Sequence, residues 1–138
     1  MEKKFDLSSL FTTTNEKSGV WYEAKIDGKE TGLEFLILGP SSDENVLSAE
    51  AYKKAKDKID AEKDPVKKSQ MDIDAVCDRI SAVVKEVRTT NGEPLYIGDK
   101  KVESSPELIK KILYENIDIR TDVFTASFES ANFRTKKL

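Results

Sequence analysis

The stretch that decides the fold is residues 19–38, GVWYEAKIDGKETGLEFLIL. Residues 20–27 alternate between apolar and polar side chains, which places the apolar ones on one face of an extended strand. Residues 33–38 are almost continuously apolar and predict a second, more buried strand. Gly28 and Gly32 lie between the two runs and favour a tight turn, so the stretch predicts a β-hairpin.

Two helices separated by a proline are expected after the hairpin. Residues 41–44 are typical of a helix start, because serine and aspartate side chains accept hydrogen bonds from the first free amides. Residues 45–64 have helical propensity, many charges and a thin apolar stripe, and Pro65 then breaks the helix. A central core helix is predicted over 66–87, because apolar residues recur there every three or four positions. They are Ile73, Val76, Cys77, Ile80, Val83, Val84 and Val87.

The rest of the chain predicts a surface loop and a pair of helices. Residues 91–94, NGEP, are a strong turn signal, and a short irregular hairpin is expected at the surface over residues 95–102. Ser105 and Pro106 suit the cap and the first position of a helix that ends near Asn116. A last helix is predicted over 118–132.

These patterns predict a single α+β domain, in which an N-terminal β-hairpin or small antiparallel sheet packs on a bundle of three to four α-helices. The length of 138 residues suits one domain. The expected divisions are a lead-in at 1–18, the hairpin at 19–39, two helices broken near Pro65 at 42–88, a loop or hairpin at 89–104, a C-terminal helical pair at 105–133 and a polar tail at 134–138.

The composition narrows the class of protein. The 26 acidic and 23 basic residues give a net charge of -3, so the chain lacks the basic excess of a nucleic-acid binder. The sequence has no apolar run that could span a bilayer and no signal-peptide core at its start, so no membrane association is expected. The single cysteine, Cys77, cannot form an intrachain disulfide, which fits a reducing compartment and predicts a cytoplasmic protein.

The sequence does not indicate an enzyme. The chain has no histidine, which excludes His-ligated metals and His-dependent catalysis. Asp72, Asp74 and Asp78 could form a carboxylate metal cluster, but a solvated helix face is the simpler interpretation. Cys77 lies in an apolar stripe with no activating base, and we expect it to be a core residue. We therefore expect no catalytic residue, no metal and no cofactor.

We expect the chain to function by binding another protein. A small domain must use its hairpin and central helix for its own core, whereas the C-terminal helices carry more apolar side chains than one face can bury. A helical partner needs such a surplus, centred on aromatic anchors. The expected contacts are Leu108, Ile112, Phe124, Phe128 and Phe133, with Phe133 as the best candidate for an exposed anchor. Core packing is the default interpretation of the three phenylalanines, and the small size of the domain and its thin other apolar stripes favour partner contact instead. Trp21 is either a further anchor or the cover of a helix flank.

Several short motifs follow one another in a characteristic order. They are Asp6-Leu7-Ser8, Gly19-Val20-Trp21-Tyr22, the turn from Gly39 to Asp43, Tyr52-Lys53-Lys54-Ala55, the apolar helix at 80–84, Gly92-Glu93-Pro94, Ser105-Pro106-Glu107 and Ala131-Asn132-Phe133. This order, over most of the chain, resembles that of tail assembly chaperones of long-tailed bacteriophages and prophages. The resemblance implies that the protein coats the tape-measure protein before the tail tube polymerises, in the cytoplasm of the infected cell, and is absent from the virion. A structural component retained in the virion, such as a minor tail or tail-completion protein, is the alternative.

The same resemblance implies which partners the chain has. They are the tape-measure protein, other copies of the chain, and the tail-tube subunits, which replace the chain on the tape-measure protein. We expect weak, concentration-dependent oligomers, because a coat around a long filament needs copies that touch one another. The charged helix at 45–64 is the expected contact between copies, and salt should weaken it.

Overall fold

The computed structural model describes residues 3–134, which have the α+β architecture that the sequence predicts. The α-helices in this range are α1 (Thr13–Ser18), α2 (Asp43–Ala61), α3 (Pro65–Ser81), α4 (Pro106–Glu115) and α5 (Ile117–Ala126), with short 3-10 helices η1 (Leu7–Leu10) and η2 (Ser130–Phe133). Strands β1 (Val20–Ile26), β2 (Lys29–Ile37) and β3 (Val84–Thr89) form an antiparallel sheet in the order β1-β2-β3. Strands β4 (Leu95–Ile97) and β5 (Lys100–Val102) form a separate hairpin. The predicted polar tail, apart from its first residue, lies outside the described residues.

The β1–β2 hairpin forms where the alternating pattern predicts it. Tyr22 lies opposite Phe35 across the two strands, so both can face the core. The turn consists of Asp27 and Gly28, whose φ angles of 54° and 75° match the positive values of a type I′ hairpin turn. Gly32, which was expected in the turn, lies inside β2 instead.

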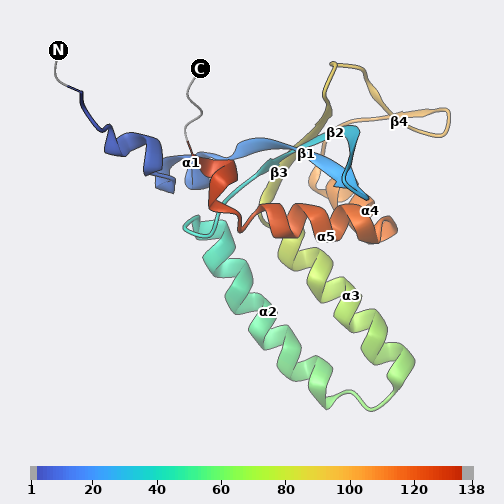
Figure 1. Ribbon diagram of the computed structural model, residues 1–138. Helices are drawn as coiled ribbons and strands as arrows, with labels where there is room; N and C mark the ends of the chain where they lie inside the picture. The colour runs from blue at the N-terminus through green and yellow to red at the C-terminus, as the bar shows by residue number, and fades with distance from the viewer. Residues whose placement is uncertain (1–2, 135–138) are drawn as a thin grey trace.

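Helices α2 and α3 form an antiparallel arm that projects away from the sheet (Figure 1). The Ser42 side chain caps α2 by accepting the Asn45 N–H at 3.2 Å. The Asp64 side chain caps α3 by accepting the Val66 N–H at 3.0 Å. Pro65 occupies the first turn of α3, where its missing N–H costs little. The predicted break near Pro65 is therefore confirmed.

The predicted end of the central helix, at residue 87, is wrong. Helix α3 stops at Ser81, and the next segment is the edge strand β3. Val84 lies opposite Ile37 and Val87 lies opposite Phe35, so both valines are buried by the sheet. The register shifts between these two pairs, which places one extra residue in β3. A spacing of three residues, normally helical, thus keeps two strand residues on the same face.

The core lies between one face of the sheet and helices α3, α4 and α5 (Figure 1). Cys77 is fully buried, as predicted for a core residue. The main buried cluster consists of Ala24, Phe35, Ile37, Ile80, Val84, Val87, Leu108, Ile109, Leu113, Ile119, Val123, Ala126 and Phe133.

The last helix is shorter than the predicted 118–132. Helix α5 ends at Ala126, and the next hydroxyl, that of Ser127, donates to the Phe124 carbonyl at 2.6 Å. Such a bond offers the backbone an alternative to further helix. The chain then turns, and η2 returns Phe133 to the core.

Candidate protein-binding surface

The C-terminal residues that were expected to bind a partner divide into a buried group and an accessible group. Leu108 is buried, and Ile112 packs against the core cluster. Phe133 is 0% exposed, so the expectation that it stands free at a helix end is wrong. The cause is the turn after α5, which places η2 beside α1, where Asn15 Nδ2 donates to the Phe133 carbonyl at 2.8 Å.

The accessible group is an aromatic pair with a cation, which we call the Phe128 cluster (Phe124, Phe128 and Arg79). The two rings meet edge to face with centroids 5.1 Å apart, and the Arg79 guanidinium carbon lies 5.7 Å from each centroid. Arg79 Nη1 donates to Ser48 Oγ at 2.7 Å, and partial burial lowers the Arg79 pKa from its ordinary value. Phe128 remains 46% exposed, so a supported ring is open to a partner.

A shallow groove of about 100 Å³ continues from this cluster between α2 and α3. Most of its lining side chains are small, which lets another backbone approach closely. The lining residues are Ser48, Ala51, Tyr52, Ala55, Ala75, Asp78 and Arg79. Leu47 is exposed and lies one helical turn before Ala51 on the same side of α2. The groove and the Phe128 cluster therefore form one continuous surface, since Arg79 belongs to both.

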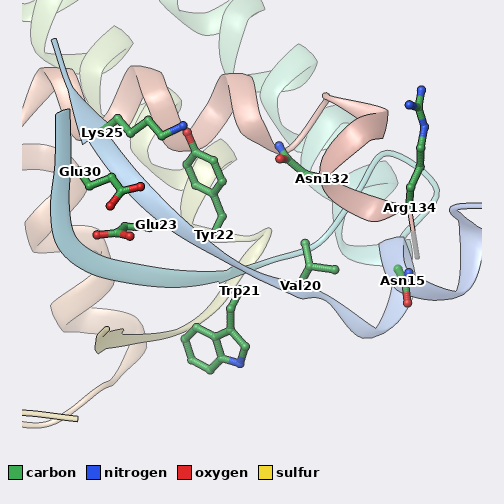
Figure 2. Close-up of a pocket in the computed structure, with 9 residues that line it drawn as sticks. All are labelled: Asn15, Val20, Trp21, Tyr22, Glu23, Lys25, Glu30, Asn132 and Arg134. Carbon is green, nitrogen blue, oxygen red and sulfur yellow. The ribbon is translucent and has the colours of Figure 1, made fainter. Parts of the chain in front are cut away.

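Trp21 lies on the other side of the sheet. Figure 2 shows Trp21 and Tyr22 pointing to opposite sides of β1, with Tyr22 directed toward α5. The Arg88 guanidinium carbon lies 3.7 Å from the centroid of the Trp21 ring, and Arg88 Nε donates to Glu34 Oε1 at 2.8 Å. Trp21 is thus half covered by a cation on β3, and the structure does not bring it together with the Phe128 cluster.

An open hollow of about 460 Å³ follows the edge strand β1 (Figure 2). Beside it, Tyr22 Oη and the Lys25 backbone N–H donate to the same oxygen, Asp122 Oδ2, at 2.8 and 2.7 Å. Burial raises the pKa of Tyr22, and the contact with Asp122 raises it further, so the phenol stays a neutral donor. These bonds attach α5 to β1 and so serve the fold.

The acidic residues of α3 do not converge. Asp72 pairs with Lys56 of α2, Asp78 pairs with Lys110 of α4, and Asp74 accepts a hydrogen bond from a glutamine one turn away on its own helix. Within residues 3–134, no group of three or more His, Cys, Asp or Glu side chains is placed to hold a metal ion. The ion pairs instead link neighbouring helices at the protein surface.

Comparison with known proteins does not assign the chain to a class: no protein-family model, no curated protein and no solved structure matches it. None of the helices that the structure describes is long and apolar enough to cross a membrane. The candidate surface is therefore interpreted from its own chemistry.

Sequence reasoning missed the polar half of this surface. Arg79 lies inside the apolar stripe of α3, between Val76 and Ile80, and a cation at such a position needs a partner. The position of Arg79 in the sequence was therefore a signal that this face of α3 also makes polar contacts. The contribution of Ser48 had no such signal, because it depends on how α2 lies against α3.

Proposed function

We propose that this protein is a bacteriophage tail assembly chaperone that binds the tape-measure protein and shields it, in the cytoplasm of the infected cell, before the tail tube polymerises. The observation that carries the proposal is the Phe128 cluster at the end of an apolar groove on a projecting arm. A helical partner with an apolar stripe can place one side chain against this groove and another against the aromatic anchor at its end.

The geometry of Phe128 supports its role as the anchor. The ring is held at one side by Phe124 and Arg79, and the rest of it is exposed. A side chain that is already positioned loses little conformational entropy when a partner binds. Aromatic residues that combine support with exposure are the usual centres of binding energy in interfaces.

The size of the groove supports a reversible complex. Its volume of about 100 Å³ accommodates little more than the edge of a partner side chain, and charged residues surround it on both helices. A chaperone that tube subunits must replace needs moderate affinity for each copy and many copies along the tape measure. A shallow groove with one aromatic anchor meets that requirement better than a deep apolar pocket.

The test is co-expression with the tape-measure protein encoded in the same genome, followed by affinity co-purification and titration of the purified partners. Phe128→Ala should weaken binding by about tenfold or more, the effect of a lost anchor. Tyr96→Ala is the matched control, because Tyr96 is an exposed aromatic residue on β4, away from the arm. Equal affinity of the wild type and a folded Phe128→Ala protein would contradict the proposal.

A second measurement separates a chaperone from a structural tail component. Purified virions are analysed by mass spectrometry for peptides of this chain. A chaperone is absent from the particle, whereas a minor tail or tail-completion protein is present at a fixed copy number. Particles that contain the chain at such a copy number would favour the structural alternative.

A further inference from the structure

The N-terminal segment, residues 3–11, exposes an unusual amount of apolar surface. Four large side chains in this short stretch are each more than half exposed. They are Phe5, Leu7, Leu10 and Phe11. Single apolar side chains are common on protein surfaces. Four within seven residues form an apolar patch, and such patches usually mark a site where another molecule binds.

This segment is ordered locally rather than extended. Asp6 Oδ1 accepts the Ser8 N–H at 2.9 Å and the Ser8 hydroxyl at 2.6 Å, and the Phe11 N–H donates to the Ser8 carbonyl at 3.1 Å. These bonds form the turn of η1, in which Leu7 and Leu10 are three residues apart and so project from one side. The segment thus presents its apolar side chains in a defined arrangement.

An apolar groove lies between the β4–β5 hairpin and α4. It is a hollow of about 390 Å³, and a second hollow of about 360 Å³ continues from it along α4 among Glu107, Lys110, Lys111, Tyr114 and Glu115. Ile97, Val102 and Leu108 line the first hollow. Ile97 is itself half exposed, so this end of the molecule also carries apolar surface without a cover among residues 3–134.

The two features lie at opposite ends of the molecule, so the segment does not reach the groove of its own chain (Figure 1). The charges of the segment and of the first hollow are complementary: Lys3 and Lys4 precede the first phenylalanine of the segment, and Glu103 and Glu107 outnumber Lys111 among the residues that line the hollow. Lys111, the cation that lines this hollow, is already paired with Glu115 at 3.8 Å, so the two glutamates leave the hollow negative.

We propose that the protein associates head to tail, with residues 3–11 of one copy docked in the β4–β5/α4 groove of the next. Two copies close into a dimer only when each docks into the other about a two-fold axis. In the head-to-tail arrangement proposed here each copy docks into the next one, so copies add in a row or a ring. The inference goes beyond the proposed function and does not depend on it, because neither surface includes the Phe128 cluster.

The test is sedimentation velocity of the full chain over a range of concentrations. The wild type should form species larger than a dimer as the concentration rises. Phe5→Ser combined with Leu7→Ser removes the segment's apolar side chains, and Ile97→Asp disrupts the groove; each should weaken association by about tenfold or more. Val66→Ser is the control, because Val66 is a highly exposed apolar residue at the far end of the arm, and it should associate like the wild type.

Mixing the two defective proteins gives the sharpest result. The segment variant retains a groove and the groove variant retains a segment, so an equal mixture should form one-to-one dimers and nothing larger. A wild type that stays monomeric, or that stops at a dimer, overturns the proposal. So does wild-type association of either variant alone, or a mixture that forms no dimer. Circular dichroism of each variant verifies that the fold is retained.

Discussion

Replacing Phe133 with alanine should destabilise the protein far more than replacing Phe128. Phe133 is 0% exposed inside the main cluster, so truncation removes buried surface and leaves a cavity. Such replacements cost about 3–5 kcal/mol. Because η2 is a short element near the chain end and can settle into the space, we expect the lower value, about 3 kcal/mol. Phe128 is 46% exposed and should cost about 1 kcal/mol.

Urea denaturation, followed by circular dichroism and Trp21 fluorescence, measures both losses. With a typical slope of about 1–3 kcal/mol per molar urea, a loss of 3 kcal/mol lowers the midpoint by roughly 1–3 M. Phe133→Leu is the matched control, since it keeps most of the apolar volume and should recover most of the stability. A loss below about 1 kcal/mol in Phe133→Ala would refute the burial argument, because a filled core position does not tolerate such a cavity.

Three other contacts give measurable outcomes. Gly39→Ala should cost about 1–3 kcal/mol in thermal melts, because an added Cβ would collide with the Glu16 side chain; an unchanged melting temperature contradicts this. Burial raises the Glu16 pKa, but hydrogen bonds from neighbouring hydroxyl and amide groups outweigh it and hold the pKa below its ordinary 4.5. Its stabilisation is therefore complete above pH 4.5 and is lost as the pH falls through the folded value, so Glu16→Gln should show a shallower decline in acid. Asp122→Ala should lower the Tyr22 pKa toward its ordinary 10.0 in an ultraviolet titration and cost about 1–3 kcal/mol; an unmoved titration would exclude the contact.

Local signals in the sequence predicted the elements whose causes are local. The alternating strand, the helix start at 41–44 and the Pro65 break all depend on neighbouring residues, and the structure has them where expected. The fold class followed from these elements, because a period-two segment followed by helical stripes has few ways to bury its apolar faces.

The errors arose where distant residues decide the outcome. Val84 and Val87 have a helical spacing, but pairing with β2 and a bulge turn them into strand residues. Phe133 follows a helix and precedes a polar tail, which is typical of an exposed end, yet a bond from Asn15, far away in the sequence, holds its backbone beside α1. No pattern along the chain carries either fact.

The candidate surface was predictable only in part for the same reason. Phe124 and Phe128 are four residues apart, and helical spacing predicted their contact, although α5 ends at Ala126 and Phe128 lies in the turn that follows. Whether other parts of the chain cover the two rings depends on how α5 packs against the arm. Only the packing of α5 against the arm places Arg79 beside the rings and leaves Phe128 accessible.

The arm formed by α2 and α3 is an insertion between β2 and β3, two strands that pair directly with each other. The chain leaves the sheet after Ile37 and returns at Val84, and at this junction the Leu38 N–H donates to the Val83 carbonyl at 2.8 Å. This hydrogen bond thus holds the two ends of the insertion next to each other. Adding one turn to both α2 and α3 would lengthen the arm by about 5.4 Å without altering the strand register. Insertions and deletions near Pro65 can therefore change how far the molecule reaches while its core stays constant.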